Sequence, residues 1–331
     1  QLEQAEKLGF RMKTGVECEY HLINSDGTDI ADTKDQQSKP CYDQQALMRQ
    51  YPVISQICDA MIELGWGPYQ NDHEDANGQY EVNFVYSDAL TTADRYTFFK
   101  MMTSQYAQKY GAIATHMAKP FTDRTGSGGH IHYHIADAAT GENLFLDKED
   151  PRGLGLSEMA YNFIGGVFAH SPALCGVMSP TVNCYKRLQV GPALMGSTSG
   201  FLWTPAFISY GDNNRTQMIR TAGPGHLEDR TMSSACNPYL SFAAYLTAGM
   251  DGIRRKLDPG EPFLGNLYEL GMEEIRRRGV RLLPQSLAEA LEELSQDELV
   301  QSSIDDGANC LIGGGIGDGC FYKPTLLIDI T

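Results

Sequence analysis

The sequence has little that would suit it to a membrane, an oxidising compartment or nucleic acid. Its most apolar stretch, Phe163 to Val177, is interrupted by residues 170–172 and is too short to cross a bilayer. The eight cysteines show no CxxC pair and no regular spacing, which is typical of reduced core residues in a cytosolic protein. The net charge of −16 disfavours phosphate backbones as partners. We therefore expect a cytoplasmic protein that binds neither membrane nor nucleic acid.

A secretory signal peptide is also missing, and the chain begins with Gln1 rather than methionine, so we expect it to start inside a longer gene product. Its 331 residues allow one large domain or two ordinary ones. A hydrophobic content of 42% and a charged content of 21% are typical of a globular protein. No internal repeat occurs, and the glycine-rich residues 313–319 lack the Lys-Ser/Thr pair of a phosphate loop.

The most informative stretch runs from Lys119 to Ile135, where a bare loop precedes an alternating run. Three glycines form the loop: Gly126, Gly128 and Gly129. The alternation predicts a half-buried strand whose polar face carries His130, His132 and His134. Imidazole is the commonest metal ligand and a good donor to phosphate. On this stretch alone, an edge strand that binds no ligand is an equal alternative.

Carboxylates gather on one face of two other predicted strands. Residues Lys13 to Ile23 alternate and place Glu17 and Glu19 opposite the apolar side chains. Residues 80–86 alternate as well, and the turn signal at Asn77-Gly78 can bring Glu74 next to Glu81. Carboxylates this close need cations between them, unless the strands are solvent-facing edges.

Positive charge is sparse, and it too occurs in strand-like or turn segments. The pair Lys186-Arg187 is either a solvated loop pair or, given its apolar flanks, an anion site. Arg215 and Arg220 flank a predicted turn. Residues 226–230 alternate, and one face carries His226, Glu228 and Arg230.

An α+β fold explains these segments: an antiparallel sheet with helices on one face and a polar cleft on the other. Helical spacing and caps predict the packing helices at residues 54–64, 87–111, 157–177 and 239–256, and another from Ser286. Mostly oxygen ligands with few nitrogens suit Mg²⁺ or Mn²⁺ rather than Zn²⁺. With arginines and a glycine loop in the same cleft, the sequence predicts ATP-dependent phosphoryl transfer.

Six motifs, in this order, resemble the catalytic domain of the glutamine synthetase family, most closely its type III glutamate–ammonia ligase and γ-glutamylmethylamide synthetase branch. They are GVECEY (15–20), HEDANGQYEVN (73–83), KPFTDRTGSGGHIH (119–132), PTVNCYKRL (180–188), NNRTQMIR (213–220) and LEDR with the following helix (227–260). The resemblance implies a catalytic domain over residues 1–304, with a curved, guanido-kinase-like antiparallel sheet flanked by helices. Residues 305–331 match nothing expected of the family and are either a divergent end or a shifted reading frame.

The resemblance also implies a reaction and its residues. Ammonia or a small amine would be joined to the γ-carboxylate of glutamate through γ-glutamyl phosphate, with ATP as substrate and two or more Mg²⁺ or Mn²⁺ ions. One metal would be held by Glu19, Glu74 and Glu81, and the other, against ATP, by Glu17, His130 and Glu228. ATP phosphates would contact His132, Arg215 and Arg220, and catalysis would use Arg215, Arg220 and Arg230. Glutamate would lie under the Gly126 loop, with its carboxylate on Arg187 and Arg230.

The family assembles as stacked rings with sites between subunits, so a homo-oligomer is expected. The N-terminal domain that donates an aspartate to the neighbouring site is absent, and the isolated chain is expected to be nearly inactive. Thr125 replaces a frequent asparagine, and Ala193 replaces a flap glutamate. The second change predicts a preference for methylamine or another short alkylamine, unless Asp212 supplies the missing carboxylate. A guanidino-phosphotransferase and a non-catalytic relative are the rival interpretations.

Overall fold

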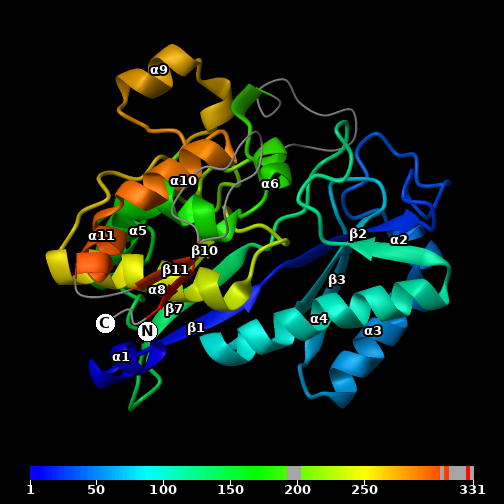
Figure 1. Cartoon of the computed structure of the whole chain (residues 1–331), viewed down its shortest axis with the longest axis horizontal. Coiled ribbons are helices and arrows are strands. Elements are labelled where there is room, and N and C mark those ends of the chain that lie inside the picture. Colours follow the sequence, from blue (N-terminus) through cyan, green and yellow to red (C-terminus); the bar gives the residue numbers. More distant parts are fainter. Residues whose placement is uncertain (192–202, 306–308, 313–325, 329–331) are drawn as a thin grey trace.

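Two sheets form the centre of the protein (Figure 1). The chain passes from one sheet to the other at Glu17. The computed structural model describes residues 1–191, 203–305, 309–312 and 326–328, with side chains up to residue 301. A six-stranded sheet has the order β5-β1-β7-β10-β9-β8: Ser87–Asp88, Phe10–Val16, Ile131–Asp137, His226–Asp229, Ile219–Gly223 and Tyr210–Gly211. A four-stranded sheet has the order β3-β4-β2-β6: Pro68–His73, Gln79–Phe84, Cys18–Asn24 and Ala112–Thr115.

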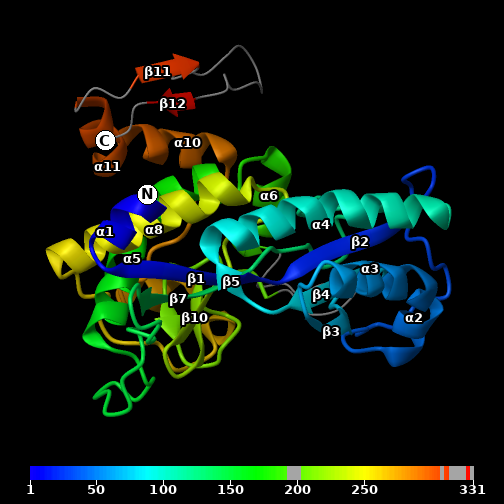
Figure 2. The same ribbon diagram turned by 90° about the horizontal axis from the view of Figure 1, so that it is seen from below.

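The strand predicted over Lys13 to Ile23 is in fact two strands in different sheets. The backbone N–H of Glu17 donates to the carbonyl of His130, and the N–H of Glu19 donates to the carbonyl of Glu17. The chain therefore leaves the β1–β7 ladder at Val16 and enters the β2–β4 ladder at Cys18. Figure 2 shows β1 and β2 following one another across the molecule. The α+β class is confirmed, with two sheets in place of the single one expected.

Strand β7 lies inside its sheet, between β1 and β10, so the alternative of an edge strand is wrong. The apolar face of β7 is buried: Ile131, Tyr133 and Ile135 are each at most 1% exposed. Tyr133 packs edge-on against Tyr245. This packing fixes the face of the strand and turns the histidines to the opposite side.

Helices cover the sheets where the apolar spacing predicts them. The main ones are α3 (Tyr51–Glu63), α4 (Ala89–Lys109), α5 (Glu158–Met178), α8 (Pro238–Arg255) and α10 (Leu287–Gln296). The others are α1 (Leu2–Lys7), α2 (Gln44–Arg49), α6 (Val182–Arg187), the 3₁₀ turn Leu267–Glu269, α9 (Met272–Arg277) and α11 (Glu298–Asp305). Strand β11 (Asn309–Ile312) pairs antiparallel with β12 (Leu326–Ile328).

Helices α5 and α8 pack against each other at very short range (Figure 2). A Cβ on Gly166 would lie 2.2 Å from the carbonyl oxygen of Ala248, and one on Gly252 would lie 2.1 Å from that of Asn162. Only glycine permits this approach. In the part of the chain that the structure describes, no helix has the length and apolar character needed to cross a membrane.

A buried histidine ties this helix pair to the junction of α10 and α11. The Nδ1 of His170 lies 2.7 Å from Asp297 Oδ2, and its Nε2 lies 3.2 Å from Asp251 Oδ2. A neutral imidazole has only one N–H, so two carboxylate partners favour the doubly protonated ring. Burial lowers the pKa of His170, but Asp297 and Asp251 outweigh burial and raise it. The other charged neighbours are Arg254, Arg255 and Glu298.

We expect the stability gained from His170 to fall at alkaline pH. A raised pKa in the folded state means that the contribution is complete below the unfolded value, about 6.5, and is lost as pH rises through the folded value. His170→Gln should therefore lower the melting temperature more at pH 6 than at pH 9, the deficit at pH 6 corresponding to about 1.5–3 kcal/mol. Equal deficits at the two pH values in thermal melts would contradict this assignment.

Candidate active site

A cleft of about 780 Å³ opens where the two sheets meet. Most of the residues predicted for the site line it: Glu17, Glu19, Glu74, Glu81, His130, His132, Arg215, Arg220 and Arg230. The described lining does not include three others that the sequence predicts: Glu228, Arg187 and Gly126. Glu228 and Arg187 are buried and Gly126 is partly exposed, and their contacts show which groups each one holds.

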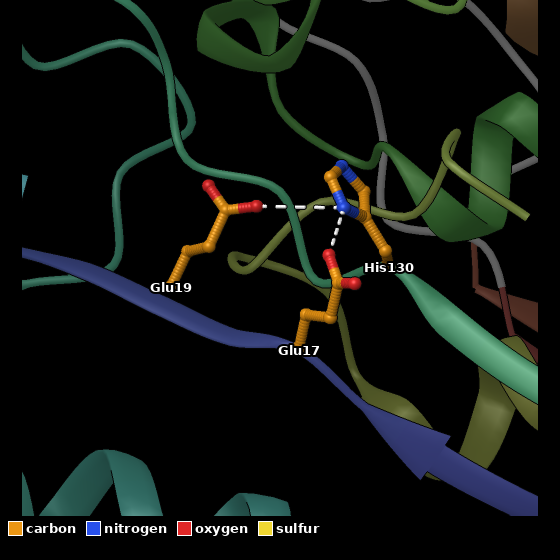
Figure 3. A group of neighbouring side chains, drawn as sticks. All are labelled: Glu17, Glu19 and His130. Carbon is orange, nitrogen blue, oxygen red and sulfur yellow. Dashed lines mark hydrogen bonds and ion pairs between the residues drawn. The ribbon is translucent and has the colours of Figure 1, made fainter. Parts of the chain in front are cut away.

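Three carboxylates converge on one ring nitrogen of His130, which is only 6% exposed. Its Nδ1 lies 2.5 Å from Glu17 Oε2, 3.5 Å from Glu19 Oε1 and 3.4 Å from Glu228 Oε1. Figure 3 shows the Glu17 and Glu19 side chains reaching this nitrogen from the segment where the chain changes sheets. One proton cannot satisfy three carboxylates, so the group is suited to a cation.

Glu17 is the member that connects this group to a second histidine. Its Oε1 lies 2.9 Å from His132 Nε2, and His132 Nδ1 lies 2.8 Å from His226 Nε2. Burial would raise the pKa of Glu17, but the two neighbouring imidazoles, His130 and His132, outweigh it and hold that pKa well below its ordinary value. Burial, assisted by His132, lowers the pKa of His226 to about 4. Glu17 is therefore an anion that two histidines hold in place.

A second group of carboxylates forms a row across three neighbouring strands. Glu19 of β2 stands opposite Glu81 of β4, and Glu81 stands opposite Asp72 of β3. Oxygens of Asp72, Glu74 and Glu81 lie within 4.8 Å of one another. Burial, and then the neighbouring carboxylates, raise the pKa of both Glu74 and Glu81 well above the ordinary value. Like charges in adjacent register repel, so this row also calls for a cation.

Asp72 is the member of this row that no sequence motif assigns to the site. Its only signal is the pairing of β3 with β4, which depends on strand register rather than on a motif. Glu19 lies between the two groups: it approaches His130 on one side and faces Glu81 across the β2–β4 ladder on the other.

Both groups fit a hard divalent ion by the chemistry of their donors. Carboxylate oxygens dominate, with one imidazole nitrogen in the first group and none in the second. Mg²⁺ and Mn²⁺ favour such ligands, whereas Zn²⁺ favours nitrogen and sulfur. The same cleft also carries Cys41 beside Glu74 and Asp75, but burial raises the pKa of this thiol to about 12 and keeps it protonated.

Arginines border the first group of carboxylates at Glu228. Glu228 is fully buried and accepts hydrogen bonds of 2.6 Å from both Arg220 and Arg230. Burial would raise the pKa of Glu228, but Arg230 outweighs it and the net shift is downward. The Nε of Arg230 is a buried donor for which the described residues offer no acceptor. Such a donor at the wall of a cleft suits an anionic ligand.

Arg187 ends helix α6, so the interpretation of Lys186-Arg187 as a solvated loop pair is wrong. Its guanidinium donates to the carbonyl oxygens of Thr231 at 3.2 Å and Arg230 at 2.6 Å. It also lies 3.2 Å from His130 Nε2. Arg187 thus contacts both His130 and the backbone of Arg230 and helps to hold them in position.

The glycine loop packs directly against the Arg187 side chain. A Cβ on Gly126 would lie 2.2 Å from the carbonyl oxygen of Ala118, and one on Gly128 would lie 2.4 Å from His130 Nε2. The N–H of Gly128 donates to Glu19 Oε2 at 2.9 Å. The loop therefore needs glycine for close approach. Ala193, which the amine preference depends on, lies outside the described residues.

Comparison with known proteins matches residues 1–308 to the family model "Glutamine synthetase, catalytic domain". The chain is 46% identical over 301 residues to a glutamine synthetase of Rhizobium meliloti (strain 1021), covering 91% of this chain and 67% of that protein. It is 45% identical over 306 residues to a glutamate–methylamine ligase of Methyloversatilis universalis, covering 92% and 68%. A solved GmaS/ADP complex superposes with a TM-score of 0.82 at 46% identity, covering 91% and 67%.

Proposed function

Because this chain belongs to the glutamine synthetase family, we propose that it joins ammonia or a small primary amine to the γ-carboxylate of glutamate at the expense of ATP. The observation that carries the proposal is the convergence of Glu17, Glu19 and Glu228 on His130, with Arg220 and Arg230 bonded to the same Glu228. A cleft in which cation ligands and guanidinium groups lie next to each other suits a reaction between two anions.

Membership in this family implies ATP and divalent metals, and we propose Mg²⁺ or Mn²⁺ as the ions. One ion would be held by Glu17, His130 and Glu228. The other would be held by Glu74 and Glu81, and Glu19 and Asp72 stand opposite Glu81 on the two neighbouring strands. Bound metal would neutralise the charge of the phosphates and the carboxylates. Removal of the metal should therefore abolish the reaction.

The arginines and the glycine loop would orient the two substrates. His132, Arg215 and Arg220 face the cleft where the triphosphate would lie, and Arg230 offers its free Nε–H to a glutamate carboxylate. A γ-carboxylate oxygen of glutamate would attack the γ-phosphorus of ATP and release ADP. The amine nitrogen would then attack the acyl carbon and release phosphate, losing a proton as the amide forms. Holding both anions side by side accounts for most of the catalysis in such a step.

Two further proposals complete this function. We propose a homo-oligomer with sites between subunits, which the family resemblance supports. We propose the cytoplasm as its location, which the irregular spacing of the eight cysteines, with no CxxC motif, supports.

The amine is the point on which the relatives differ, since one is a glutamine synthetase and another is a glutamate–methylamine ligase. Ala193 stands where a flap glutamate is usual, and loss of that carboxylate weakens selection for ammonium. We expect methylamine to be used at least as well as ammonia. Burial of its methyl group would add about 1 kcal/mol to the binding free energy, so the preference for methylamine should be modest.

The test is a competition between ammonia and methylamine in the longest natural polypeptide that contains this sequence, compared by kcat/KM for the free bases. Ala193→Glu is the matched variant and should shift the ratio toward ammonia by about tenfold. If ammonia wins by more than tenfold in the unmodified protein, the methylamine preference is wrong and glutamine synthesis is the function.

A further inference from the structure

Gln79, the first residue of β4, has no role in the function proposed above, yet it touches both halves of the site. Its side chain is 1% exposed. The Nε2 lies 2.8 Å from Glu19 Oε2 and 3.2 Å from the carbonyl oxygen of Gly126. It also lies 3.3 Å from Ser127 Oγ. One buried amide group therefore joins a carboxylate of the cation site to the glycine loop.

The orientation of this amide is fixed by its other end. The Oε1 of Gln79 accepts a hydrogen bond of 3.0 Å from the backbone N–H of Ala76, in the turn that leads into β4. A carboxamide has its donors on one end and its acceptor on the other, so the N–H groups must face Glu19 and Gly126. The reverse orientation would oppose oxygen to oxygen at both contacts. Both ends of the Gln79 carboxamide therefore have partners of the right kind, donors opposite acceptors.

The two carboxylate oxygens of Glu19 have different partners as a result. Oε2 accepts from Gln79 Nε2 and from the backbone N–H of Gly128, at 2.8 and 2.9 Å. Oε1 is left on the side of the cleft, 3.5 Å from His130 Nδ1. Hydrogen bonds of this kind orient a metal ligand and raise the affinity of its site. Any shift of the 126–128 loop would act on the same carboxylate, because both of its Oε2 donors contact or belong to that loop.

We propose that Gln79 is a positioning residue that holds Glu19 and the 126–128 loop as one unit, so that cation binding and glutamate binding strengthen each other. The inference rests on the proposed function, in which Glu19 borders a bound ion and the glycine loop orients the substrates, and on the family resemblance, which implies that glutamate lies under that loop. Such coupling is reciprocal: the factor by which glutamate tightens the binding of the ion equals the factor by which the ion tightens the binding of glutamate.

The test uses Gln79→Met, which keeps the unbranched shape of the side chain and removes every hydrogen bond. Mn²⁺ binding is measured by electron paramagnetic resonance, with and without saturating glutamate. Mn²⁺ should bind about 10- to 100-fold more weakly. The tightening by glutamate should fall toward a factor of one. Gln79→Asn retains the amide but shortens its reach by one methylene group, and it should change both quantities in the same direction.

Thr103→Val is the matched control for a loss of stability alone. Thr103 is fully buried in α4 and donates to the carbonyl of Phe99 at 2.9 Å, outside the cleft lining. This variant should lower the melting temperature and leave Mn²⁺ binding and its response to glutamate unchanged. If Gln79→Met does not fold, Gln79→Asn carries the same comparison.

The outcomes separate this inference from the function on which it rests. A folded Gln79 variant with unchanged Mn²⁺ affinity and an unchanged response to glutamate would overturn the inference alone. An unmodified protein in which glutamate and Mn²⁺ bind independently would do the same. An unmodified protein that binds no Mn²⁺ would overturn the proposed function, and this inference with it.

Discussion

Replacing Glu17 with alanine should reduce ligase activity at least about 1,000-fold, the rate equivalent of about 4 kcal/mol. Glu17 belongs to two groups of potential cation ligands: one with Glu19 and His130, the other with His132 and Glu228. No other residue named for the site hydrogen-bonds to both histidines within the described structure. Its removal would take a ligand from the cation site and remove the one carboxylate that His130 and His132 share.

The same variant should lose part of the rise in melting temperature that Mg²⁺ or Mn²⁺ gives to the unmodified protein by mass action, because the second group of carboxylates is retained. Melting curves with and without millimolar metal measure this directly. Glu142→Ala, a change at an exposed carboxylate outside the cleft lining, is the control and should retain both activity and metal response. A Glu17→Ala protein that metal stabilises as much as it stabilises the unmodified protein would rule out Glu17 as a ligand.

Replacing Arg230 with methionine should raise the KM for glutamate about 100-fold, with a smaller effect on the KM for ATP. Arg230 is 4% exposed, and its Nε–H is the buried donor left for a substrate carboxylate. Loss of a charge-assisted hydrogen bond costs about 1.5–3 kcal/mol. Leaving Glu228 with Arg220 as its one remaining arginine partner adds to that cost.

Steady-state kinetics with glutamate and ATP varied separately would measure this effect. Arg230→Lys keeps the charge but not the two-donor geometry. Its KM for glutamate should therefore lie between that of the unmodified protein and that of Arg230→Met. Arg276→Met, at an exposed position on α9, is the control for loss of a cation. A KM for glutamate that Arg230→Met leaves unchanged would exclude Arg230 from the substrate site.

The sequence predicted which face of each strand carries the site residues better than it predicted which strands lie next to one another. Alternation in residues 130–135 was sufficient to place the histidines opposite the apolar side chains, because a strand has a period of two. It could not show that the chain changes sheets at Glu17, because the alternation continues through the break. The row formed by Asp72, Glu81 and Glu19 depends on strand register, which long-range pairing fixes.

Arg187 and Gln79 show the same limit for single residues. A cation in an acidic chain suggested a ligand contact for Arg187, but its guanidinium in the structure is bonded to backbone carbonyls behind the cleft. Gln79 gave no signal, since an uncharged amide in a strand is common and its partners lie 47 and 60 residues away in the chain. Only the folded structure brings these partners together.

Transfer of oxygen from glutamate to phosphate tests the central claim most directly. Glutamate labelled with ¹⁸O in its γ-carboxylate is incubated with ATP, Mg²⁺ and ammonia or methylamine, and the released phosphate is analysed by mass spectrometry. Formation of γ-glutamyl phosphate predicts one ¹⁸O in the phosphate for each amide formed. Amide formation with unlabelled phosphate, or release of ADP that does not depend on glutamate, would contradict the account.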